Sequence, residues 1–135
     1  MTRVMRLMAL IGVSLSMASL AWATETHRAT VGQNGVQRVH ILGGNYFFRP
    51  DHIIVKANVP VELMVSKEVG IAPHNLVIQA PAAGIDIRTD LSVAPKTITF
   101  TPKRPGRHPF YCDKKLLFFP SHREKDMEGV LEVVE

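Results

Sequence analysis

Short stretches that alternate between apolar and polar residues, separated by Gly, Pro and Asn, constrain the fold of this chain most strongly. A two-residue period is typical of β-strands with one buried face, and no convincing amphipathic helix interrupts it. Seven stretches follow the pattern: 36–42, 51–57, 61–67, 74–80, 96–101, 107–112 and 129–135. Residues 80–95 are the least regular and predict a loop or a short helical turn. We therefore expect an all-β fold, a Greek-key β-sandwich or barrel of about seven strands.

The first 23 residues differ from the rest of the chain. Arg3 and Arg6 precede an apolar run from Leu7 to Leu20, and Ala21-Trp22-Ala23 has the small-x-small form of a cleavage site. These features predict a secretory signal peptide over residues 1–23 and export to the periplasm. The apolar run is shorter than the roughly 20 residues that a membrane-spanning helix needs, so we expect no transmembrane anchor after cleavage.

Residues 24–35 are polar and lack periodicity, which predicts a flexible lead-in before one domain over residues 36–135. The segment from Lys96 to Lys125 is basic: it holds eight Lys and Arg against Asp113 and Glu124. Such a run is either a solvated face or a surface that attracts an acidic partner. The chain lacks a long basic helix and zinc-finger spacing, so we expect no nucleic acid.

The chain has a single cysteine, Cys112, although an exported domain folds where disulfides form. Cys112 is then buried and inert, bridged between chains, or bound to a metal. His122 and Met127 follow it within the last 24 residues, and His74 opens another predicted strand. Taken singly, each of these residues is more often a structural one. Together, a thiolate, two imidazoles and a thioether suit copper, and the loops at one end of a β-sandwich converge.

Four segments of the chain resemble the cupredoxins, the blue copper proteins of the plastocyanin, pseudoazurin and azurin type. They are "YFFRPDHIIVKANVPVEL" at 46–63, "PHN" at 73–75, "PGRHPFYC" at 105–112 and "HREKDMEGVLEV" at 122–133. The resemblance implies that His74, Cys112 and His122 bind one copper ion, with Met127 as the axial ligand. It also implies that Asn75 ties the two ligand loops together by hydrogen bonds. A turn-forming role is the alternative for Asn75.

The chain departs from the cupredoxin pattern between Cys112 and His122. Nine residues, "DKKLLFFPS", separate them, where cupredoxins usually have only a few. A long loop can fold back at little cost, because closure entropy grows slowly with length. His108, four residues before Cys112 on one predicted strand face, is the reserve ligand if His122 does not bind, and otherwise a supporting or structural residue. Asp126 stands where the family often has Gly.

The loop after Cys112 has two interpretations. Its apolar residues could form a plug over the metal or extend the core, or they could form an exposed docking patch for a redox partner. The predicted patch consists of Lys114, Lys115, Leu116, Leu117, Phe118, Phe119 and Arg123, with Lys125 nearby.

The sequence thus predicts a monomeric, exported mononuclear copper protein. It would carry single electrons between periplasmic partners such as an acidic cytochrome or oxidoreductase, and it would not be an enzyme. A second hypothesis keeps the copper but has the protein buffer or deliver it, and His27 in the lead-in is either solvent-exposed or a weak copper ligand. A third makes Cys112 and a nearby His a thiol enzyme, and a fourth is a metal-free interaction module.

Overall fold

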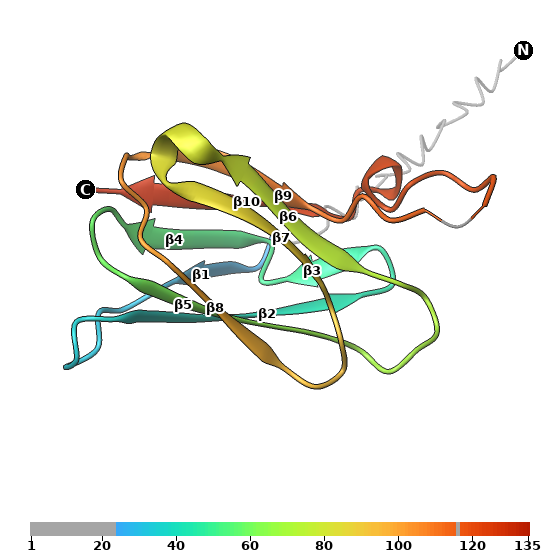
Figure 1. Ribbon diagram of the computed structural model, residues 1–135, viewed down its shortest axis with the longest axis horizontal. Helices are drawn as coiled ribbons and strands as arrows, with labels where there is room; N and C mark the ends of the chain where they lie inside the picture. Colours follow the sequence, from blue (N-terminus) through green and yellow to red (C-terminus); the bar gives the residue numbers. More distant parts are fainter. Residues whose placement is uncertain (1–23, 116) are drawn as a thin grey trace, which may run out of the picture.

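Two β-sheets face each other in the computed structural model, which describes residues 24–115 and 117–135 (Figure 1). The predicted signal peptide, residues 1–23, and Leu116 lie outside the described residues. The larger sheet has the order β1 (Thr26–Arg28), β4 (His52–Lys56), β10 (Glu128–Val134), β9 (Gly106–Tyr111), β6 (Asn75–Ala80) and β7 (Ile85–Asp90). The smaller sheet has the order β3 (Phe47–Arg49), β2 (Gln37–Gly44), β5 (Val61–Lys67) and β8 (Lys96–Phe100).

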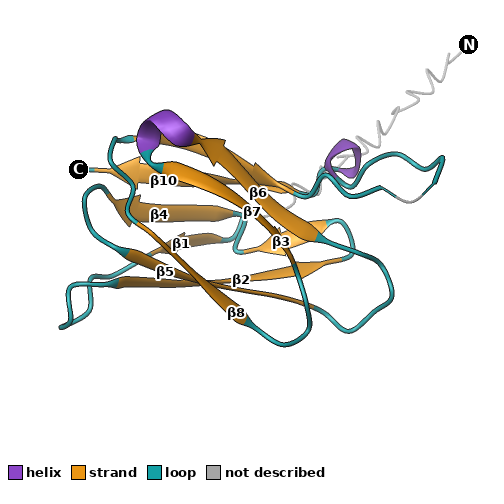
Figure 2. Cartoon of the chain, viewed as in Figure 1, coloured by secondary structure: helices purple, strands orange, loops and turns teal. Residues whose placement is uncertain are grey.

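The predicted all-β class is confirmed, and each of the seven predicted strands is present. Figure 2 shows strands joined by loops, with two short 3₁₀ turns, η1 (Pro81–Ala83) and η2 (Arg123–Lys125). Among the described residues, neither turn has the length or the apolar character that a membrane crossing requires. Three further strands, β1, β3 and β7, were not expected. β7 lies within the segment 80–95 that the pattern left irregular, although its buried Ile85 and Ile87 alternate with exposed Asp86 and Arg88.

Residues 24–35 are a correction to the expected flexible lead-in. Thr26–Arg28 form β1, which pairs in parallel with β4, and the Ala29 N–H donates to the Ile54 carbonyl oxygen at 2.9 Å. The Ala29 side chain joins the buried core. An edge strand with only polar, exposed side chains has no alternation of apolar and polar residues. Its backbone pairing therefore cannot be predicted from the sequence pattern.

The core lies between the two sheets and follows from the alternation. In β5, Val61, Leu63 and Val65 are buried, while Glu62 and Met64 between them point away. Apolar side chains on the inner faces leave water together, which is the main stabilising contribution of such a sandwich. The three strands β6, β9 and β10 are neighbours in the larger sheet, and this arrangement positions the residues described next.

Candidate metal centre

Strand ends place the predicted ligand residues at one end of the larger sheet. β6 begins directly after His74, β9 ends directly before Cys112, and β10 begins directly after Met127. Because β9 is antiparallel to both β6 and β10, the start of β6, the end of β9 and the start of β10 meet at that end. Figure 1 shows the loop between β9 and β10 projecting beyond the sheets there.

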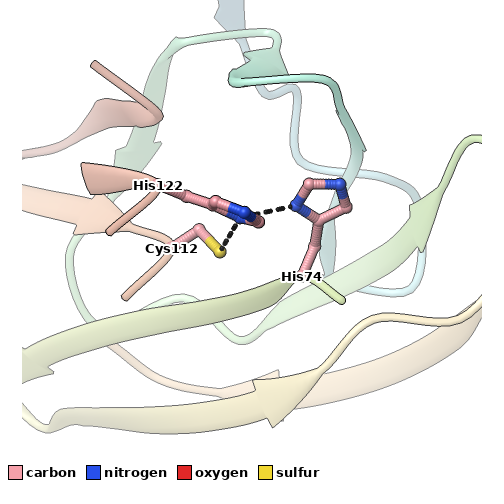
Figure 3. A group of neighbouring side chains, drawn as sticks. All are labelled: His74, Cys112 and His122. Atoms are coloured by element: carbon pink, nitrogen blue, oxygen red, sulfur yellow. Dashed lines mark hydrogen bonds between the residues drawn. The ribbon is translucent and has the colours of Figure 1, made fainter. Parts of the chain in front are cut away.

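His74, Cys112 and His122 form a buried group whose potential ligand atoms all lie within 4.8 Å of one another. The Nδ1 atom of His122 is 3.0 Å from the Nδ1 atom of His74 and 3.3 Å from the Sγ atom of Cys112. Figure 3 shows a ring nitrogen of His74 and the sulfur of Cys112 both turned toward the same nitrogen of the His122 ring. Two nitrogen donors and one sulfur donor at this separation could hold one metal ion.

Burial sets the protonation states of this group in the metal-free protein. It lowers the pKa of His74 to about 4, with smaller contributions from the nearby His122 and Lys67, and it also lowers the pKa of His122. Burial raises the pKa of the Cys112 thiol, against the opposing effect of backbone N–H groups that would stabilise the thiolate. Both imidazoles are therefore neutral near pH 7 and free to bind a metal, whereas the thiol must first lose its proton.

Asn75 links the two chain segments that carry the sulfur and the first imidazole. Its side-chain Nδ2 donates to Asp113 Oδ1 at 2.8 Å, and its Oδ1 accepts from the Asp113 N–H at 3.0 Å. The Asn75 backbone N–H also points at Cys112 Sγ, 3.4 Å away. This part-buried pair of bonds between the start of β6 and the segment just after β9 is the linkage that the sequence resemblance implies for Asn75.

Backbone hydrogen bonds fold the long loop back on itself at its base. The His122 N–H donates to the Lys114 carbonyl oxygen at 2.8 Å, which closes residues 115–121 into an excursion outside the ligand frame. The Met127 N–H then donates to the His122 carbonyl at 3.0 Å, and the Cys112 N–H donates to the Met127 carbonyl at 3.1 Å. Backbone hydrogen bonds thus join Cys112, His122 and Met127 directly to one another, and none of these bonds involves a residue of the excursion.

Solved structures share this architecture. No protein-family model matches the chain, and a comparison with curated proteins finds no match. The metal-binding domain of the Cu(I)-exporting P-type ATPase CopA of Streptococcus pneumoniae D39 is 24% identical, with a TM-score of 0.62 over 84% of this chain and 99% of that chain. A dithionite-reduced auracyanin from Roseiflexus castenholzii is 21% identical, with a TM-score of 0.58 over 79% of this chain and 99% of that chain.

Auracyanin A, a "blue" copper protein from Chloroflexus aurantiacus, is 18% identical, with a TM-score of 0.54 over 74% of this chain and 100% of that chain. The chain has a cupredoxin fold. Within this fold, as the convergence of loops at one end of a sandwich predicted, the His-Cys-His group lies where strand ends meet.

Met127 has a fully buried side chain and belongs to the same core cluster as Cys112. The preceding residue, Asp126, has a φ of 63°, in the left-handed region that glycine adopts most readily. This conformation explains why glycine suits the position in related sequences, and Asp is among the residues that tolerate it. The role of Met127 as axial ligand stays a prediction.

The apolar tip of the excursion is exposed, so the interpretation of a plug or a core extension is wrong for residues 117–119. The exposed fractions of Leu117, Phe118 and Phe119 are 74%, 101% and 65%. The excursion is closed off by the bond between Lys114 and His122, and Figure 1 shows the loop extending past the ends of the sheets. The basic residues around it are partly engaged: Lys114 pairs with Asp90 at 2.8 Å, and Arg123 lies 3.6 Å from Glu128.

His108, the predicted reserve ligand, is not part of the His-Cys-His group. It lies in the middle of β9 opposite Leu131 of β10, several residues from the end of the strand where Cys112 sits. Its Nε2 atom is buried and has no hydrogen-bond partner among the described residues. Sharing a strand face does not bring two residues to the same end of the strand. His27 lies in β1 and is exposed.

Tyr46 is a residue at the site that the sequence did not reveal. Its ring packs edge-to-face against the ring of His122, with centroids 5.3 Å apart, and it is half-exposed. Its φ of 61° is unusual for a bulky residue and turns the ring toward His122. Because this contact depends on a left-handed turn between β2 and β3, only a pattern of homologous sequences could have pointed to it.

Proposed function

We propose that this protein binds one copper ion through His74, Cys112 and His122, with Met127 as a weak axial ligand, and carries single electrons outside the cytoplasm. One observation supports the proposal above all others: two imidazole nitrogens and a thiol sulfur, all buried, lie within 4.8 Å of one another. When bound, copper would supply reversible one-electron chemistry. Sulfur favours Cu(I) and imidazole accepts both oxidation states, so this donor set serves both states of such a carrier.

The frame around the group suits electron transfer. The two Asn75–Asp113 bonds and the backbone bonds among Cys112, His122 and Met127 fix the donors from several strands. Donors that cannot move much keep a similar geometry in both oxidation states, which keeps the reorganisation accompanying each electron small. The ring of Tyr46 packs edge-to-face against His122 and is itself half-exposed, and we propose that electrons enter or leave on this side.

The expected redox partner, an acidic protein such as a cytochrome or oxidoreductase, stays a proposal. Lys115 and Lys125 are exposed near the site, while Lys114 and Arg123 already lie beside carboxylates. The attraction of an acidic partner would therefore be modest and sensitive to salt. That the protein acts as a monomer and that it is not an enzyme are likewise predictions.

Periplasmic location depends on the predicted signal peptide. Cleavage after Ala23 would give an exported protein that begins at Thr24. It would also remove Trp22, the only tryptophan of the chain. Intact mass and the loss of indole fluorescence in protein recovered from a periplasmic fraction test this part of the proposal.

Copper loading tests the central part. The purified protein, titrated with Cu(II), should bind one equivalent and develop a visible sulfur-to-copper charge-transfer band with a matching paramagnetic-resonance signal. Cys112→Ser should abolish the band, and His122→Ala should change or abolish it. His108→Ala is the matched control, because His108 lies outside the group, and it should leave the spectrum unchanged. A colourless loaded protein, or a band that survives Cys112→Ser, would refute the proposal.

Copper buffering or delivery is the second candidate. The metal-binding domain of the Cu(I)-exporting ATPase shares this fold, and its structure was solved with Cu(I). The same architecture therefore also serves in a protein that exports copper. A carrier of electrons should hold copper through many reduction cycles and exchange it slowly with a competing chelator. Fast, complete exchange with a Cu(I) chelator, together with slow reduction by a cytochrome, would favour buffering or delivery instead.

A further inference from the structure

Large exposed apolar side chains gather at the metal end of the molecule. Two loops carry them: the loop between β5 and β6 exposes Val69 (88%) and Ile71 (105%), and the excursion exposes Leu117 (74%), Phe118 (101%) and Phe119 (65%). Soluble domains rarely leave several large apolar side chains fully uncovered in one region. Exposure near 100% means that no neighbouring residue of the domain covers these side chains.

Each of the two loops adjoins a residue of the His-Cys-His group. Val69 and Ile71 line the same surface depression as His74, between β5 and β6. The excursion is closed by the bond between the Lys114 carbonyl and the N–H of His122. Figure 1 shows both loops extending past the ends of the strands at the same end of the sandwich. We refer to Val69, Ile71, Leu117, Phe118 and Phe119 as the apolar tips.

We propose that the apolar tips insert into the interfacial region of a lipid bilayer and hold the metal end of the protein against the membrane. Separate, projecting tips match a soft surface, which can take up each side chain without a preformed pocket. A protein partner would instead need a groove shaped to receive the excursion and a second one for the loop between β5 and β6. This inference does not require copper, so its failure and that of the proposed function are distinguishable.

Exposed lysines favour the same orientation, with the metal end toward the membrane, but they should contribute little to the binding free energy. Lys115 at the start of the excursion and Lys125 shortly after it are exposed and can approach anionic headgroups. Lys114 and Arg123 are already beside Asp90 and Glu128. Apolar transfer should therefore dominate, and binding should depend only weakly on salt.

The start of the described chain is consistent with this orientation. Thr24 lines the same surface cleft as Glu128, which directly follows Met127. The domain is thus joined to the predicted signal peptide near its metal end.

A single tryptophan placed in the excursion tests the proposal directly. The protein used begins at Thr24, contains every strand and core residue of the described fold, and lacks tryptophan because Trp22 is absent. Phe118→Trp then reports its own environment. Added vesicles of phosphatidylcholine, with or without phosphatidylglycerol, should shift its emission to shorter wavelength. Val31→Trp is the matched control: Val31 is exposed but lies outside the two loops, and its emission should not shift.

Polar substitutions measure the contribution of each loop. Phe118→Ser and Ile71→Ser should each weaken vesicle partitioning roughly tenfold, since each removes one large apolar side chain from the inserted set. Val31→Ser should leave partitioning unchanged. Circular-dichroism spectra and urea midpoints of all variants should match the parent, which shows that they are folded whether or not copper binds. An unshifted Phe118→Trp emission with every vesicle, or equal partitioning of all variants, would overturn the proposal and leave a protein partner as the occupant of the tips.

Discussion

The segment between Cys112 and Met127 contains two regions with opposite properties. At its base, Cys112, His122 and Met127 are buried and joined to one another by backbone hydrogen bonds. At its tip, Leu117, Phe118 and Phe119 are exposed and contribute nothing to the core. The contrast shows that the ligand positions depend on the frame of strand ends and hydrogen bonds, and that a nine-residue spacing is compatible with a closed ligand group.

The largest effect on stability is expected from adding a side-chain atom at Gly129, at the start of β10. A Cβ atom there would collide with the ring of Phe110 and with the Asp51 carbonyl oxygen, which already accepts the N–H of Val130 at 2.8 Å. Because backbone cannot shift there cheaply, Gly129→Ala should lower the free energy of unfolding by about 3 kcal/mol or more, measured by urea denaturation. Gly70→Ala, in the loop between β5 and β6 with nothing within 4 Å of the added atom, should change it little. Equal effects of the two substitutions would contradict the distinction between frame and loop.

The next largest effect should follow from cutting the link between the ligand segments. Asn75→Ala removes both bonds to Asp113 from a buried position, which should cost about 2 kcal/mol of unfolding free energy. It should also weaken copper binding by roughly 10- to 100-fold, because the orientation of the donors loosens. Thermal unfolding and a competitive copper titration measure the two effects. Asn34→Ala, an exposed asparagine, is the control, and a similar loss in that variant would show that Asn75 has no special role.

The buried imidazoles should make the metal-free frame sensitive to acid. In the unfolded chain His74 has an ordinary pKa of 6.5, whereas in the folded protein its pKa is lowered to about 4. Between these values the unfolded state binds more protons, so stability should fall as the pH decreases from about 6.5 to about 4. The lowered pKa of His122 acts in the same direction. Urea midpoints across this range should show the decline, and His74→Gln should reduce it; a flat profile in the parent would contradict the burial argument.

Much of the frame could be predicted because it depends on local patterning. Alternation located β5 and β9, and strand ends bring their flanking residues together in any sandwich. The exposed tip could not be assigned, since "LLFF" is equally apolar in a core, over a metal or in solvent. β1 has no alternation to detect, and the contact of Tyr46 with His122 requires the three-dimensional turn.

The smallest effect is expected from removing the excursion. Replacing residues 115–121 with Gly-Gly makes Lys114 and His122 the two ends of a tight turn, so the His122 N–H can keep its 2.8 Å bond to the Lys114 carbonyl oxygen. The visible spectrum of the copper-loaded protein should be unchanged, and the free energy of unfolding should change by less than about 1 kcal/mol, because loop length carries a small entropic cost. Vesicle binding, by contrast, should fall sharply. Loss of the copper spectrum on this replacement would show that the excursion shapes the site.

X-ray absorption at the copper edge of the loaded protein tests the central claim most directly. We predict one short copper–sulfur distance, from the Cys112 thiolate, and two copper–nitrogen distances with imidazole scattering, from His74 and His122. The sulfur contribution should disappear in Cys112→Ser. A spectrum with only oxygen and nitrogen neighbours, or with a single imidazole, would contradict the ligand group on which this account is built.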